Sequence, residues 1–334
     1  MKILVIHPGS LGDVILSLPS LHALRQAYPM ARLDGMGNPS IFELLKERFY
    51  ITDVISIDRA DVSSCLTGQS DPASPLPCAL REYAFVVNWL GDQDGEFSCP
   101  LHRLGVRKIF SSRPISHETA HQHRTQIFLD ALAPLGIPNP FTRPRLFPSL
   151  EDKRLGQQAL AWAGVSLKEQ PILAIHPGSG GVLKCWDLSR FIAVSHCVQE
   201  QLGFRPLFIL GPADQAISQS LKNSWGDDLS ILECVPLPVL AGALTWCSGY
   251  LGNDSGVTHL AAALDIPTVA IFGPTHPDLW APIGHGVTIL SKRKEGRHVG
   301  GGVCQGCDCL GLITVEDVMP ALAKIALDYS SVIC

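Results

Sequence analysis

An eight-residue pattern of apolar positions occurs twice along the chain. Residues 3–10 have the sequence ILVIHPGS, and residues 172–179 repeat it as ILAIHPGS about half a chain length later. Both copies are apolar runs rich in β-branched residues that end at Pro and Gly. This pattern is typical of buried parallel strands that lead into a turn at the carboxyl edge of a sheet. Because ligands bind at this edge in open α/β sheets, each half of the chain is expected to present one such turn to a ligand.

Helical spacing follows the first copy of the repeat. Apolar residues recur at this spacing from Val14 to Tyr28, and Pro19 is expected to bend the helix. A second strand is expected near residues 33–36. Strand, helix and strand together form a βαβ unit.

Strands and helices alternate along the rest of the chain. Further buried strands are expected at residues 85–88, 207–210, 250–252 and 268–272. Helices are expected between them, for example at residues 188–201 and 239–246. The alternation predicts an α/β protein with two Rossmann-like, doubly wound domains that face a central cleft. We expect the domains to cover residues 1–150 and 151–334, with a linker around residues 144–151 and the last helix free to pack back on the first domain.

One segment of the first domain does not fit this alternation. Residues 63–77 are rich in Pro and Ser and predict a long surface loop. Such a loop is either a binding loop or an insertion without function, and the sequence favours neither.

Composition excludes several classes of protein. The 334 residues are 46% hydrophobic, enough to bury more than one core. Charged residues make up 17% and the net charge is −5, which argues against disorder and against bulk binding of nucleic acid. No apolar run approaches the roughly 20 residues of a membrane span. Since no signal peptide precedes the first strand, we expect a cytoplasmic protein.

The charges are unevenly divided between the two halves. Acidic and basic residues balance in the first half, whereas the second half carries the whole acidic excess. Histidines lie beside arginines between Arg113 and Arg124, and this stretch becomes more positive near an acidic surface. The first half is therefore expected to meet an anionic partner.

The turn after the first strand offers a candidate catalytic carboxylate. Gly9 and Gly12 allow a ligand to approach the backbone, and Asp13 lies near the start of the following helix. An Asp at this position caps a helix, which stabilises it by about 1 kcal/mol. The alternative is a general base that takes a proton from an incoming hydroxyl. Position alone leaves both roles open.

A second candidate site lies at residues 252–259, with the sequence GNDSGVTH, between an apolar strand and a short helix. A diphosphate needs backbone N–H donors and the positive end of a helix dipole, and both are available from Ser255 onward. A plain turn explains the glycines but not the crowding of Asp254, Thr258 and His259. A phosphate site is favoured.

Lys184, in the loop after the second copy of the repeat, can neutralise a departing nucleotide diphosphate, although a single loop lysine is more often solvated.

Two sets of residues have the composition of a metal site. Asp92 and Asp94 have a spacing that can hold a divalent cation, but they lie between two glycines, so a turn is favoured. Cys304, Cys307 and Cys309, together with His298, could supply four zinc ligands. Only one pair of these cysteines has the usual two-residue gap, so free thiols in a surface loop are favoured. We therefore expect no metal site.

Several of these segments resemble one known family. The sequence SLGDVILSLPSLHALRQAYP at residues 10–29, HPGS at residues 176–179, Lys184 with Trp186, and NDSGVTHLAAALDIPTVAIFGPTHP at residues 253–277 are similar to the bacterial heptosyltransferases, glycosyltransferase family 9. The resemblance implies a GT-B fold and an inverting, metal-independent glycosyltransferase that needs no cofactor. Its donor would be a nucleotide sugar, ADP-heptose, held by the second domain. Its acceptor would be lipopolysaccharide core or a related glycolipid, bound by the first domain, with peripheral contact to the inner membrane and no role for nucleic acid.

The resemblance also implies roles for individual residues. Asp13 resembles the catalytic base and Lys184 the residue that pairs with the diphosphate. The donor contacts would be Gly178, Ser179, Asp254, Ser255, Gly256 and His259. The chain departs from the family at Gln215 and Ala216, where acidic residues are usual. This departure weakens a donor-ribose role for Asp214.

Two other functions remain compatible with the sequence. A nucleotide-sugar epimerase of the same fold would convert its donor without an acceptor, and a non-catalytic nucleotide-sugar-binding protein would leave the donor unchanged. Since Asp13 and Lys184 are both present, a non-catalytic scaffold is disfavoured.

Overall fold

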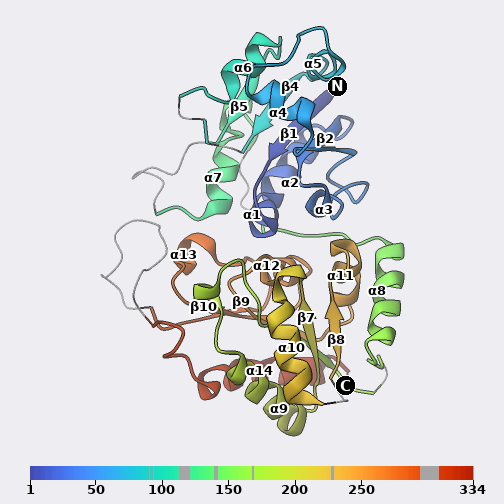
Figure 1. Ribbon diagram of the computed structural model, residues 1–334, viewed down its shortest axis with the longest axis vertical. Coiled ribbons are helices and arrows are strands. Elements are labelled where there is room, and N and C mark those ends of the chain that lie inside the picture. Colours follow the sequence, from blue (N-terminus) through green and yellow to red (C-terminus); the bar gives the residue numbers. More distant parts are fainter. Residues whose placement is uncertain are drawn as a thin grey trace. The chain divides into compact units, whose positions relative to one another are not determined.

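The computed structural model describes residues 1–89, 91–92, 94–112, 121–138, 142–167, 169–226, 229–293 and 308–333, without the side chains of residues 330–333. The chain divides into two compact units, Met1–Phe147 and Pro148–Cys334 (Figure 1). In the part of the chain that is described, no helix combines the length and the apolar character needed to cross a membrane.

The first unit is built around a five-stranded sheet in the order β3-β2-β1-β4-β5, with every pair of neighbouring strands parallel. Strand β1 lies at the centre, where Ile3 is opposite Leu33 on one side and Phe85 on the other. The elements are β1 (Lys2–His7), α1 (Leu11–Leu16), α2 (Leu18–Ala27), β2 (Arg32–Gly37), α3 (Pro39–Phe42), β3 (Asp53–Ser56), α4 (Ala60–Leu66), α5 (Pro75–Leu80), β4 (Phe85–Asn88), α6 (Ser98–Arg103), β5 (Ile109–Ser111), α7 (Arg124–Asp130) and a 3-10 helix (Ala133–Leu135).

The predicted βαβ unit is confirmed, with one refinement. The helix after β1 is interrupted at Ser17, and Pro19 lies in the first turn of the second helix, α2. Proline is tolerated there because its missing N–H would have no partner inside the helix. The bend expected at Pro19 is therefore a boundary between two helices.

The prediction of a long surface loop at residues 63–77 is wrong at both ends. Helix α4 extends to Leu66 and α5 begins at Pro75, so the connection is much shorter. Buried Cys65 and Leu76 pack into the apolar core of the unit with Leu4 of β1. Some of the Pro and Ser residues that suggested a loop lie within these helices; Pro75, for example, is in the first turn of α5, where proline is compatible with helical geometry.

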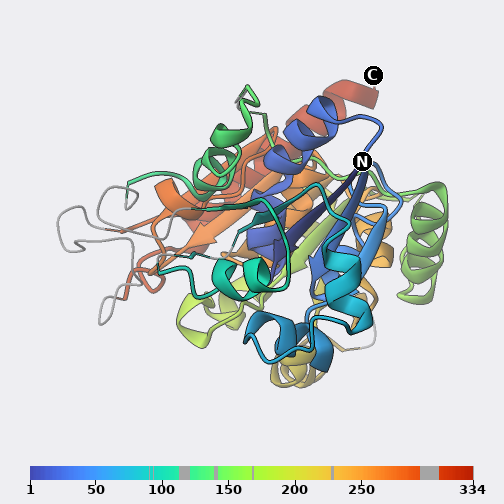
Figure 2. The same cartoon turned by 90° about the horizontal axis from the view of Figure 1, so that it is seen from above.

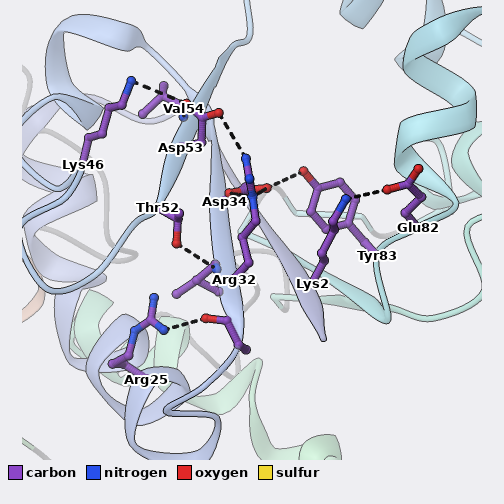
Figure 3. Close-up of polar contacts among 12 residues, drawn as sticks. Lys2, Arg25, Arg32, Asp34, Lys46, Thr52, Asp53, Val54, Glu82 and Tyr83 are labelled. Carbon is purple, nitrogen blue, oxygen red and sulfur yellow. Dashed lines mark hydrogen bonds and ion pairs between the residues drawn. The ribbon is translucent and has the colours of Figure 1, made fainter.

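A polar cluster joins β2 to its neighbours in the first unit (Figure 3). Asp34, only 3% exposed, accepts hydrogen bonds from Arg32 Nε at 3.0 and 2.9 Å and from the Tyr83 hydroxyl at 2.9 Å. Asp53 of β3 pairs with Arg32 at 3.2 Å and with Lys46 at 3.5 Å. Burial and the bond to Asp34 raise the pKa of Tyr83. The buried carboxylate is thus fully partnered, as a buried charge must be.

The second unit has a six-stranded sheet in the order β11-β10-β9-β6-β7-β8, again with parallel neighbours throughout. This is the doubly wound order of the Rossmann fold, with β6 and β9 at the point where the order reverses. The elements are α8 (Leu150–Trp162), β6 (Ile172–His176), a 3-10 helix η2 (Val182–Lys184), α9 (Leu188–Leu202), β7 (Arg205–Leu210), η3 (Pro212–Asp214), α10 (Gln215–Trp225), β8 (Ile231–Glu233), α11 (Leu237–Leu244), β9 (Gly249–Asn253), α12 (Gly256–Ala263), β10 (Thr268–Phe272), α13 (Pro277–Trp280), β11 (Val287–Ser291) and α14 (Val315–Ile333).

Two packing contacts organise the helices of this unit. Helix α8 lies beside α11 in both views (Figures 1 and 2), and a Cβ atom at Gly156 would be only 2.1 Å from the backbone nitrogen of Ala243. The helix backbones therefore touch directly. The last helix, α14, contributes Leu322 and Ile325 to the same core as Phe191 of α9. These buried side chains of α14 therefore belong to the core of the second unit.

Candidate functional site

Asp13 follows β1 at the carboxyl edge of the first sheet. It is the third residue of α1 and forms a capping box with Ser10: its Oδ2 accepts hydrogen bonds from the Ser10 backbone N–H at 3.0 Å and from the Ser10 hydroxyl at 2.7 Å. The capping role that the sequence left open is therefore confirmed. Since the Asp13 side chain stays partly exposed, a hydroxyl can still approach it.

His7 lies directly beneath this turn, and no sequence pattern indicated a role for it. Its Nδ1 accepts a hydrogen bond from the Gly9 N–H at 3.1 Å, and its ring packs against Trp89 and Phe128 with centroids 5.5 and 5.2 Å away. Burial lowers the pKa of His7 to about 4, although the nearby Asp13 carboxylate opposes the shift. His7 is therefore neutral at neutral pH, with its proton on Nε2.

Arg124, the first residue of α7, brings a positive charge to the same turn. It is 4% exposed. Burial lowers the pKa of its guanidinium, and the charge of Asp13 opposes that shift. The sequence placed Arg124 at the end of a basic stretch but could not show that its charge interacts with that of Asp13. Most of that stretch, residues 113–120, lies outside the described part of the chain.

In the second unit, the turn after β9 leads into α12. Ser255 caps this helix, and its hydroxyl accepts a hydrogen bond from the Thr258 N–H at 3.4 Å. Gly256 is the first helical residue, and Asp254, Ser255 and His259 are each at most 8% exposed. The turn thus places its side chains at a helix N-terminus on the carboxyl edge of the sheet, which is a general site for anions.

Three predicted site residues meet at this turn, although they come from distant parts of the sequence. Lys184 Nζ lies 2.8 Å from Asp254 Oδ2, with the lysine side chain 31% exposed and the aspartate side chain 9% exposed. The Ser179 hydroxyl donates to the backbone carbonyl of Asp254 at 2.7 Å. The structure therefore brings the loop after β6 against the loop after β9.

Packing constrains the identity of Gly178. A Cβ atom there would be 2.2 Å from Oδ1 of Asp214. Asp214, at the end of η3, is 6% exposed, and its Oδ2 accepts a hydrogen bond from the Gly211 N–H at 2.7 Å. Asp214, for which the sequence gave only weak support as a donor residue, thus lies beside Gly178.

The histidines of the two repeat copies have different hydrogen bonds. His176 Nδ1 donates to the Ile209 carbonyl at 2.8 Å, whereas Nδ1 of His7 accepts. Burial lowers the pKa of His176 as well. The repeat therefore conserves the position of the ring but not its tautomer, and neighbouring backbone groups decide which nitrogen carries the proton.

Two of the residues with metal-ligand spacing, Asp92 and Cys309, have other partners. Asp92 accepts hydrogen bonds from the N–H groups of Phe97 at 3.0 Å and Ser98 at 3.2 Å, where α6 begins, and Gln93 lies outside the described residues, so the predicted turn stays a prediction. Within the described ranges, no group of three or more His, Cys, Asp or Glu side chains is arranged to hold a metal ion. Cys309 is buried and disulfide-bonded, so the prediction of a free surface thiol is wrong there. His298, Cys304 and Cys307 lie outside the described residues.

Comparison with known proteins places the chain in a family. Residues 101–300 match glycosyltransferase family 9 (heptosyltransferase). The chain is 23% identical to lipooligosaccharide heptosyltransferase 2 of Haemophilus ducreyi over 317 residues, which cover 87% of this chain and 88% of the relative.

Two solved structures share the fold. A family 9 glycosyltransferase from Veillonella parvula has a TM-score of 0.77 at 22% identity, covering 98% of this chain and 97% of that one. ADP-heptose lps heptosyltransferase II of E. coli has a TM-score of 0.77 at 19% identity, covering 99% and 100%. The predicted GT-B fold is confirmed. The chain is a glycosyltransferase and belongs to glycosyltransferase family 9, the heptosyltransferases.

Proposed function

We propose that this protein transfers a heptose from ADP-heptose to lipopolysaccharide core or a related glycolipid, with inversion at the anomeric carbon and without a metal ion. Names of relatives support both substrates, since one similar structure is an ADP-heptose lps heptosyltransferase. The observation that carries the proposal is the cluster of Ser179, Lys184 and Asp254 beside the N-terminus of α12.

The donor diphosphate would bind at this cluster. Its negative charge is matched by the Lys184 ammonium and by the N-terminal amides of α12 at Ser255 and Gly256. Asp254 keeps the lysine in place at 2.8 Å. The remaining donor contacts that we propose are Gly178, Ser179 and His259. A pre-positioned cation of this kind stabilises charge that develops on the leaving group, which is how such sites accelerate reactions.

Asp13 would act on the acceptor. Its carboxylate takes the proton from an acceptor hydroxyl, the hydroxyl oxygen forms a bond to the anomeric carbon of the donor, and the bond from that carbon to the diphosphate oxygen breaks. The leaving ADP keeps the electron pair. General-base assistance of this kind contributes about 10²- to 10⁴-fold in rate. Because the His7 ring is neutral, it supports the turn without forming an ion pair with the Asp13 carboxylate.

The acceptor suggests where the reaction takes place. A glycolipid acceptor lies in a membrane surface, so we place the protein in the cytoplasm, in peripheral contact with the inner membrane. The arginines and histidines between Arg113 and Arg124 support this, because such a stretch gains positive charge near anionic lipids.

The test is a transfer reaction that contains a chelator, ADP-heptose and a heptose-deficient lipopolysaccharide core. We expect ADP release that requires the acceptor and a product one heptose heavier. Lys184→Met should lower turnover by about 100-fold or more, as loss of a leaving-group contact does. Lys222→Met is the matched control, because Lys222 forms an exposed ion pair with Glu233 at 3.1 Å. ADP release without acceptor, or a metal requirement, would contradict the proposal.

A further inference from the structure

The side-chain amide of Asn253 joins two backbone groups that lie far from it in the sequence. Asn253 ends β9 and is completely buried. Its Nδ2 donates to the Pro177 carbonyl at 2.7 Å, and its Oδ1 accepts from the Trp186 N–H at 3.0 Å. The orientation of the amide is unambiguous, because a backbone carbonyl can only accept and a backbone N–H can only donate.

These two backbone groups are the ends of one loop. The segment between Pro177 and Trp186 carries Gly178, Ser179 and Lys184, and Asn253 bridges its base. The loop tip is held by its own turn, in which the Lys184 N–H donates to the Gly181 carbonyl at 2.9 Å.

The bridge also fixes the position of this loop relative to Asp254, the residue that follows Asn253. Asp254 receives the Ser179 hydroxyl on its carbonyl and the Lys184 ammonium on its carboxylate. Two consecutive residues therefore make four contacts to one loop. Without the amide, two buried backbone groups would lose their partners, and each such loss costs about 1–3 kcal/mol.

We propose that Asn253 is a positioning residue for the donor site: its amide bridges the base of the loop from Pro177 to Trp186 and thereby holds Ser179 and Lys184 against Asp254. This inference rests on the proposed donor site. Position 253 requires an amide, since the bridge needs one donor and one acceptor on a side chain of this length. A carboxylate supplies only acceptors, and an apolar side chain supplies neither.

The test is Asn253→Asp, with ADP affinity measured by calorimetry from about pH 8 to about pH 6. At high pH the new carboxylate accepts from Trp186 but repels the Pro177 carbonyl, so we expect ADP to bind at least about 10-fold more weakly than to the wild type. At low pH the buried carboxyl becomes protonated, and its O–H can donate to Pro177. Much of the affinity, relative to the wild type at the same pH, should therefore return. A purely structural role would not produce this pH-dependent recovery.

Two further variants of this chain complete the test. Ser195→Ala removes a buried hydrogen bond within α9, from the Ser195 hydroxyl to the Phe191 carbonyl at 2.8 Å, and should leave ADP affinity unchanged. Asn253→Ser retains one polar group and should also bind ADP at least about 10-fold more weakly, which covers the case in which the Asp variant does not fold. A folded Asn253 variant that binds ADP like the wild type at every pH overturns the inference. If the wild type itself binds no ADP, the proposed donor fails and the inference fails with it.

Discussion

Asp13 has two roles to separate, because the residue proposed as the base also caps a helix. The substitution that separates them is Asp13→Asn. An asparagine oxygen can still accept the two hydrogen bonds from Ser10, at 3.0 and 2.7 Å in the native protein, but an amide does not take up a proton at neutral pH. The variant therefore keeps the cap and loses the base.

The expected magnitudes differ enough to decide between the roles. Retaining the capping bonds limits the loss of stability to the charge–dipole part, about 0.3–1 kcal/mol. Loss of the base raises the activation barrier by about 3–5 kcal/mol, which corresponds to a 10²- to 10⁴-fold lower turnover. Ser10→Ala should do the opposite: it removes the hydroxyl partner of Asp13, costs about 1 kcal/mol of stability and changes turnover by less than about 10-fold.

The assay combines single-turnover ADP release with urea unfolding of both variants, and ADP affinity is measured to confirm that the donor still binds. We expect Asp13→Asn to be stable and nearly inactive, and Ser10→Ala to be less stable and active. If Asp13→Asn keeps more than about a tenth of wild-type turnover, the general-base argument is refuted, because even the lower limit of such assistance is about 100-fold.

Two further predictions concern stability. Gly156→Ala should lower the free energy of unfolding by about 2–3 kcal/mol in chemical denaturation, because its Cβ would lie 2.1 Å from the Ala243 backbone nitrogen, whereas Gly180→Ala, with open space around it, should change little. His7 has a folded-state pKa of about 4, below the ordinary 6.5, so the unfolded chain takes up a proton first as pH falls. Stability should therefore decrease by about 2 kcal/mol from about pH 7.5 to about pH 5, and urea unfolding of His7→Asn should lack this part of the decrease.

Many secondary structure elements were predictable from the sequence. Strands β4 and β10 begin and end at the predicted residues, and α9 differs from its prediction by one residue. Buried parallel strands are continuous apolar runs, and their turns need Gly and Pro, so both signals are local. The loop prediction for residues 63–77 was wrong because Pro and Ser occur at the starts of helices as well as in loops. Only the burial of residues such as Cys65 and Leu76 distinguishes the two cases.

The candidate site was predictable only in part. The motifs located Asp13, Lys184 and the turn at residues 252–259, because glycines and polar residues after a strand are a local signal. They contain His7 and Asn253 as well, but they indicated no role for either residue. The ring of His7 is buried against Trp89 and Phe128, and the amide of Asn253 bonds to backbone groups of another segment, so neither role is visible in the sequence.

The sequence by itself determined that the chain has two doubly wound α/β halves and which loops lie at the carboxyl edges of their sheets. Apolar periodicity and turn residues act through neighbouring positions, so they can be recognised without the fold. Only the tertiary structure decided that Lys184 pairs with Asp254, that the ring of His7 is neutral and that the amide of Asn253 bridges one loop. These properties depend on burial and on hydrogen-bond partners distant in sequence, which exist only after the sheets have assembled.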